Sequence, residues 1–152
     1  MTRGQGPVRV IGGKVLDSTV LVAMAGRRLE ALLVLDYAER TASTLLVPAP
    51  AVVDAYLELD SDEAAILAEL LDSGVIVVDP LTADNAPAVA GRIPAPLLRA
   101  HEGRGLLALE VGHAALLATS RGWPVVTCST ARWAGAEGIR EHQLRISASR
   151  LP

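Results

Sequence analysis

Four oxygen-bearing side chains occupy places where a parallel sheet would present a binding site. Asp17 comes directly after an apolar segment, and Asp54 lies on the helical stretch that follows Pro48. Glu110 lies near the start of a long helical pattern, and Ser129 comes just after another apolar segment. Because ligands of open parallel sheets bind beyond the carboxyl ends of the strands, we expect these side chains to meet there.

The expected cluster of carboxylates implies a bound cation. Carboxylates that converge with no basic residue between them repel one another, and their burial is costly unless a cation joins them. Hard oxygen ligands favour Mg²⁺ or Mn²⁺ over zinc. Such an ion can generate a hydroxide and stabilise charge on a phosphate during in-line attack. The pattern therefore predicts metal-dependent hydrolysis of a phosphodiester.

Apolar segments typical of strands alternate with helical patterns along the chain. Strands are expected at about residues 9–16, 45–48, 75–78, 124–128 and 139–146. Helices are expected from residue 20, from residue 48 to about 57, and at about 27–40, 63–71, 82–90, 97–101 and 106–121. This alternation predicts an α/β fold, namely a three-layer α/β/α sandwich with a mostly parallel central sheet.

Local signals indicate how the first strand and the next helix meet. The pair Gly12–Gly13 suggests a bend or a bulge within the first strand. Ser18 or Thr19 is expected to cap the helix that begins at Val20. Asp17 could instead be the cap, because a carboxylate at that position is also favoured by the helix dipole.

Length and composition indicate a single domain with an aliphatic core. The chain has 152 residues, of which 51% are hydrophobic and only 3% aromatic, with no Phe. We expect a flexible N-terminal tail at 1–7, one domain at 8–146 and a C-terminal tail at 147–152. No apolar stretch approaches the ~20 residues that a bilayer requires. A single cysteine, Cys128, expected to be a buried thiol, fits a reducing cytoplasm.

The charge balance gives no general attraction for nucleic acids. The net charge is -3, so binding to a polyanion would need a local basic patch. Arginines that could form a phosphate-binding rim are Arg92, Arg99, Arg104, Arg121 and Arg132, although scattered surface positions are the default expectation. Trp123 and Trp133 could stack on bases, or pack in the core or an interface.

Four sequence motifs resemble those of PIN domains. Residues 15–21 (Val-Leu-Asp-Ser-Thr-Val-Leu) are similar to the opening motif of that family, and Val47-Pro48-Ala49 with Asp54 to the second. Residues 110–119 are similar to the third motif, and residues 122–127 to the strand that leads to the fourth. The resemblance covers about residues 8–146, which is nearly the whole chain.

This resemblance implies a PIN-like fold and a metal-dependent ribonuclease. Members of the family are often the toxin of a bacterial toxin–antitoxin pair and often homodimers. The implied partners are therefore RNA, an antitoxin or another protein, and a second copy of the chain. The residues implied to be catalytic and to hold Mg²⁺ or Mn²⁺ are Asp17, Asp54 and Glu110. Those implied to support them are Ser18 or Thr19, which would orient Asp17, together with Thr127 and Ser129.

Three positions depart from the family pattern. Asp54 stands where the family normally has Glu, Glu110 where it normally has Asp, and Ser129 where a further Asp is common. If the third motif is matched one residue further on, Val111 takes the acidic position. These departures support an alternative function, a catalytically degenerate PIN-like module that binds a partner protein or RNA.

Structural roles remain open for the same side chains. Asp54 and Glu110 could be solvated helix residues, and Ser129 could cap the segment 130–133. His113, one turn after Glu110, is expected to be packed or hydrogen-bonded rather than a ligand. A nucleotide-binding or small-ligand α/β protein has little support, because no glycine-rich loop follows the first strand.

Overall fold

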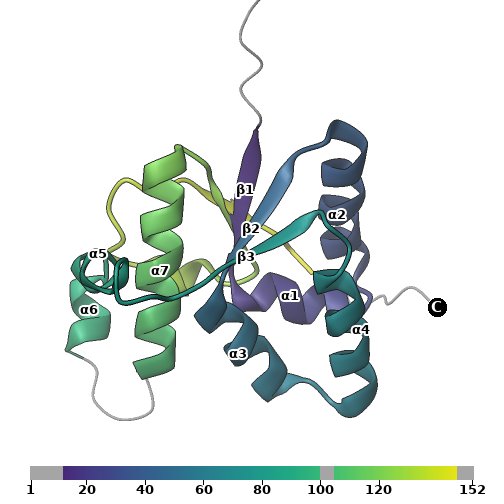
Figure 1. Cartoon of the computed structure of the whole chain (residues 1–152), viewed down its shortest axis with the longest axis horizontal. Coiled ribbons are helices and arrows are strands. Elements are labelled where there is room, and N and C mark those ends of the chain that lie inside the picture. Colours follow the sequence, from purple (N-terminus) through teal and green to yellow (C-terminus); the bar gives the residue numbers. More distant parts are fainter. Residues whose placement is uncertain (1–11, 100–104, 147–152) are drawn as a thin grey trace, which may run out of the picture.

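The computed structural model describes residues 12–99 and 105–146 and has one central sheet (Figure 1). Five parallel strands pair in the order β3-β2-β1-β4-β5. They are β1 (Gly13–Leu16), β2 (Thr44–Pro48), β3 (Ile76–Asp79), β4 (Val125–Thr127) and β5 (Glu141–Gln143). The predicted α/β sandwich with a parallel sheet is confirmed, and every strand pair in the described part of the chain is parallel.

Helices cover both faces of this sheet. They are α1 (Ser18–Ala25), α2 (Leu29–Thr41), α3 (Ala49–Glu58), α4 (Ser61–Leu71), α5 (Ala86–Gly91), α6 (Ala95–Leu98) and α7 (Gly105–Arg121), with a short 3₁₀ helix η1 (Thr130–Trp133). In Figure 1, α5, α6 and α7 lie on one side of the strands and α2 and α4 on the other. Among the described residues, no helix is long and apolar enough to cross a bilayer.

The strands send alternate side chains into two separate cores. Val15, Leu46 and Val125 pack against α7, whereas Leu16 and Val126 face the side of α1, α2 and α4. Successive side chains of a strand point to opposite faces, so strands covered on both sides must be apolar throughout. This explains why the buried residues 15–16, 45–47 and 125–126 of β1, β2 and β4 are all apolar.

The first helix starts earlier than predicted. Asp17, rather than Ser18 or Thr19, is the N-cap of α1, and its side chain accepts a hydrogen bond from the Thr19 N–H. The chain turns into the helix directly at the end of β1, which leaves the carboxylate beside the first free N–H groups. Similarly, Asp60 forms a capping box with Glu63, so α4 begins at Ser61.

A bend or a bulge was predicted at Gly12–Gly13, and the bulge is wrong. Gly13 pairs in regular register with Thr44. A Cβ atom at Gly13 would lie 2.5 Å from a ring carbon of Trp123 and 2.7 Å from the carbonyl oxygen of Thr44. Glycine is therefore used here for close packing and not for an irregular backbone.

Other differences lie at the ends of elements. α5 begins only at Ala86, because Pro87 fits the first turn of a helix but not its interior. The last strand is shorter than expected, and its three residues are exposed. The expected helix 97–101 is instead α6, which begins at Ala95 and ends at Leu98. The expected strand start at residue 9 and both tails lie outside the described residues, so the domain limits stay a prediction.

Candidate functional site

The carboxyl ends of β1, β2 and β4 gather polar side chains at one edge of the sheet. Asp17 comes directly after β1, and Asp54 lies on α3, which continues directly from β2. Thr127 ends β4, and Ser129 follows it. Glu110 enters from α7, which packs against α3. Parallel strands bring these residues to the same edge, because all of them run in one direction.

Asp17 is fully buried, and both of its carboxylate oxygens accept hydrogen bonds. Oδ1 accepts from the backbone N–H of Thr19 at 3.0 Å and from the Thr19 hydroxyl. Oδ2 accepts from the indole N–H of Trp133 at 3.1 Å. Thr19 therefore contacts Asp17, whereas Ser18 turns to other partners. The Trp133 ring is buried, which is the packing alternative, and its hydrogen bond to Asp17 was not predicted.

Ser18 joins the other two acids. Its backbone N–H donates to Oε1 of Glu110 at 2.7 Å, and its hydroxyl donates to Oδ2 of Asp54 at 2.6 Å. Glu110 is fully buried, and its Oε2 has no hydrogen-bond partner among the residues that the structure describes. Val111 packs in the core between α7 and the sheet, so Glu110 is the residue of this pair that reaches Ser18.

Arg132 places a cation among these oxygen atoms. Its Nη1 lies 2.8 Å from the Ser18 hydroxyl, 3.1 Å from Oε1 of Glu110 and 3.5 Å from Oδ2 of Asp54. The expectation that the acids converge with no basic residue between them is wrong. The position of Arg132 shortly after Ser129 places it near this edge of the sheet, but nothing in the sequence marked its contact with the acids.

The two neighbouring acids have opposite pKa shifts. Burial, together with a hydrogen bond to Asp54, raises the pKa of Glu110 to about 8. Burial would also raise the pKa of Asp54, but hydrogen bonds from Glu110 and Ser18 and the charge of Arg132 lower it overall. At neutral pH, Glu110 is therefore largely protonated, and an ionised Asp54 faces the guanidinium.

These side chains do not fit a divalent ion in this arrangement. Both oxygens of Asp17 accept hydrogen bonds, and Arg132 contacts one oxygen of Asp54 and one of Glu110. Within residues 12–99 and 105–146, no three His, Cys, Asp or Glu side chains are grouped so that they could hold a metal. A divalent ion would need ionised carboxylates with free lone pairs.

Thr127 and Ser129 shape the loop after β4. The Thr127 hydroxyl accepts from the Ser129 N–H at 3.0 Å and donates to the Ser129 carbonyl at 3.1 Å. The Cys128 N–H donates to the Thr19 hydroxyl, which ties this loop to α1. Burial raises the pKa of the Cys128 thiol, which is half-buried. Ser129 is the N-cap residue of η1, as the capping interpretation had it, but its side chain makes no cap hydrogen bond.

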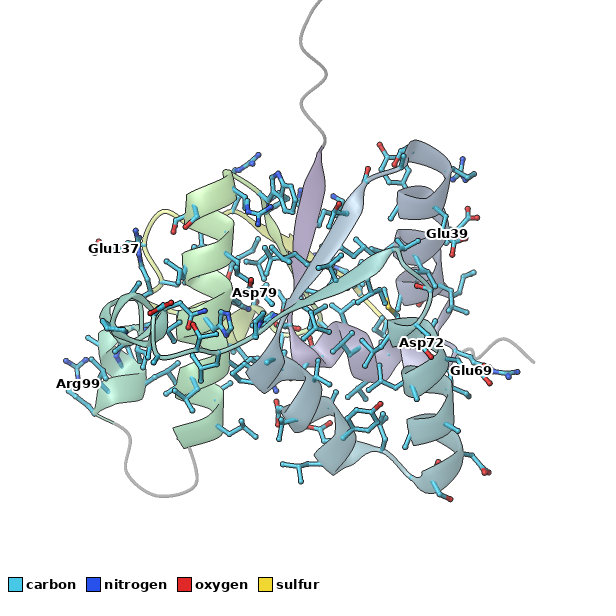
Figure 2. All side chains as sticks on the ribbon, in the orientation of Figure 1. Glu39, Glu69, Asp72, Asp79, Arg99 and Glu137 are labelled. Carbon is cyan, nitrogen blue, oxygen red and sulfur yellow. The ribbon has the colours of Figure 1, made fainter. Side chains whose placement is uncertain are left out.

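His113 joins β3 to α7, as its packed role suggested. Its Nε2 lies 2.8 Å from Oδ2 of Asp79, and the imidazole is fully buried. Figure 2 shows Asp79 at the end of β3, on the side toward α7. Because His113 lies one turn after Glu110 on α7, this pair joins β3 to the helix that carries Glu110.

The chain is similar to known proteins in fold and not in sequence. No family model matches the chain, and no curated protein matches it by sequence. VapBC2 from Rickettsia felis, solved with a DNA fragment from its promoter, is 11% identical, with 87% of this chain and 98% of that chain covered at a TM-score of 0.63.

FitAcB from Neisseria gonorrhoeae gives a second match. It is 20% identical, with 85% of this chain and 96% of that chain covered at a TM-score of 0.52. A structure of FitAB bound to the IR36 DNA fragment is 19% identical, with 85% and 93% covered at the same TM-score. The chain therefore has the fold of the PIN-domain toxins of the VapC and FitB type.

Proposed function

We propose that the protein is a catalytically degenerate PIN-like module that binds a protein partner. The observation that carries this proposal is the contact of Arg132 with Asp54 and Glu110. A guanidinium stays protonated in proteins, so it can neutralise the acids but cannot activate a water molecule as a divalent metal does. Arg132 therefore compensates the negative charge of the acids but does not activate water.

The protonation of the acids supports the same proposal. With Glu110 largely neutral and Asp54 paired with Arg132, the cluster of these three side chains has little net charge near pH 7. Binding of a divalent ion would require loss of the Glu110 proton and displacement of the guanidinium. Both steps oppose metal binding.

Exposed apolar side chains favour a protein as the partner. Leu29, Leu33 and Tyr37 are 42%, 54% and 51% exposed and recur on one face of α2. Beside them is a groove of about 550 Å³, which is lined by α2, β4 and the β5 segment. Contiguous exposed apolar surface marks protein interfaces more often than RNA-binding surfaces, which are basic. An antitoxin-like protein, as the family resemblance implies, would suit this surface.

The second candidate is a metal-dependent ribonuclease. It is favoured by the convergence of carboxyl groups from β1, α3 and α7 on one edge of the sheet. Asp17, Asp54 and Glu110 would then hold Mg²⁺ or Mn²⁺ after Arg132 moves away. A cytoplasmic location and a homodimer would fit either candidate.

One experiment separates the two candidates. The purified chain is incubated with mixed-sequence RNA and Mn²⁺, and cleavage is followed beside the variants Asp17→Asn and Asp54→Asn. The degenerate module gives no cleavage above buffer and no rise in melting temperature with Mn²⁺. Mn²⁺-dependent cleavage that both variants abolish would establish the ribonuclease instead.

A further inference from the structure

We propose that the Arg132 guanidinium takes the place of a divalent cation, and that removing its charge converts Asp54, Glu110 and Ser18 into a site that binds Mn²⁺. This inference rests on the proposed function, since it explains what keeps a metal out of the site. It assigns to one residue the difference between a metal site and a metal-free one.

The contacts of Arg132 are the first support. A single nitrogen, Nη1, faces oxygens from three elements: α1 through Ser18, α3 through Asp54 and α7 through Glu110. Convergent oxygens around one positive centre are also what a hard divalent ion selects. Such an ion would draw the oxygens closer by roughly 1 Å, because its ligand distances are about 2.0–2.2 Å.

The buried Glu110 carboxyl is an independent support. It is 0% exposed, and its Oε2 accepts no hydrogen bond from the described residues. A buried carboxylate oxygen without a donor is costly, so the group either keeps a proton or meets a cation. Nη1 of Arg132 lies 3.1 Å from Oε1 of Glu110 and 3.5 Å from Oδ2 of Asp54, so the two carboxyl groups are close enough to share one charge partner.

Loss of Arg132 leaves this pair without its counter-charge. Removing one partner of a partly buried ion pair leaves an uncompensated charge, which costs stability unless a proton or another cation takes its place. Methionine keeps much of the length of the arginine side chain without a charge or a hydrogen-bond donor. The variant Arg132→Met therefore tests the charge with little change in packing.

Mn²⁺ titration of four proteins tests the inference. These are the wild type, Arg132→Met, the double variant Arg132→Met/Asp54→Asn, and Arg99→Met. The last removes the same charge from the C-cap residue of α6, and Figure 2 shows Arg99 pointing outward there. Melting temperature and calorimetry are read with and without Mn²⁺. Arg132→Met should bind one Mn²⁺ and gain several degrees, whereas the wild type, the double variant and Arg99→Met should show no shift.

Each other outcome is also decisive. If Arg132→Met is unfolded alone but folds when Mn²⁺ is added, the inference is supported; if it stays unfolded with Mn²⁺, or folds and binds none, the inference is overturned. Wild-type protein that binds Mn²⁺ as tightly as Arg132→Met overturns it as well. The proposed function is judged separately, by whether the wild type cleaves RNA.

Discussion

At the scale of single residues, the main energetic feature of the site is an acid that is buried beside another acid. Glu110 has no exposed surface, and its nearest charged groups are Asp54 and Arg132. A protonated Glu110 avoids a second negative charge beside Asp54, which is why its pKa is raised. The stability of the protein must therefore depend on pH through Glu110.

Stability should fall as the pH rises from about 4.5 to about 8. The pKa of Glu110 rises from 4.5 to about 8 on folding, so the folded state binds more protons than the unfolded state in this range. The contribution is fully present below pH 4.5 and is lost as the pH rises through 8. The measurement is the free energy of urea unfolding against pH, with Glu110→Gln as the control.

Between pH 4.5 and 8, the free energy of unfolding should fall less steeply with pH for Glu110→Gln, because glutamine carries no titrating proton. Asp54, whose pKa is lowered, acts in another range and removes stability only as the pH falls below its ordinary value of 3.8. An equal slope in the wild type and Glu110→Gln would show that Glu110 titrates normally in the folded protein.

Trp133→Phe should destabilise the protein by about 1–3 kcal/mol. The indole N–H is the donor to Oδ2 of Asp17, and phenylalanine would leave that buried oxygen without it. Urea unfolding measures the loss. Trp123→Phe is the matched control, because the Trp123 ring packs under Arg121 and none of its described contacts involves the site. Equal losses for the two variants would mean that ring volume, and not the hydrogen bond, matters.

The residue scale also marks the limit of prediction from sequence. Asp17, Asp54 and Glu110 could be selected because backbone direction alone brings the ends of parallel strands to one edge. The contact of Arg132 could not be selected in the same way, since a long side chain can point to solvent or fold back over its own loop. Only the positions of the neighbouring oxygens decide between these directions.

At the scale of elements, periodicity located the helices and strands, and local chemistry decided their ends. The strand near residues 75–78 and the helix near 106–121 both appear within a residue of their expected bounds. The caps at Asp17 and Asp60 differ because their carboxylates bind N–H groups that a periodicity pattern does not record. The order of the strands is set by contacts across the chain, and no pattern within one segment contains it.

Gly112 controls how closely α5 approaches α7. A Cβ atom there would lie 2.6 Å from Cγ1 of Ile93 and 2.7 Å from the carbonyl oxygen of Val89. Because the carbonyl belongs to the backbone, α5 would have to shift, and Gly112→Ala should cost about 1–3 kcal/mol. Gly105→Ala, in the same helix with open space around it, should be neutral or slightly stabilising. Thermal unfolding of both variants measures the difference.

At the scale of the whole molecule, the cluster of acids with Arg132 and the exposed apolar surface of α2 lie in different places. At the carboxyl edge of the sheet, Asp17 and Glu110 are buried and Asp54 and Arg132 are half-buried, whereas the apolar face of α2 is open to solvent beside a groove. Lys14 also lines the groove, and its Nζ lies 3.0 Å from Nδ1 of His142. A degenerate module would use the open α2 surface for binding and the acids at the sheet edge for structure.

We expect the α2 face to bind an apolar segment of a protein partner that also carries acidic residues, which would suit Lys14 and the nearby Arg140. The variant Leu33→Asp/Tyr37→Asp should lose the partner, because the two residues line the groove and are about half exposed. Leu98→Asp, on the exposed side of α6, is the control and should keep it. The measurement is co-purification with the product of the adjacent open reading frame, with melting temperatures recorded to confirm folding. If both variants retain the partner equally, binding uses another surface, and α2 is exposed for a reason unrelated to this partner.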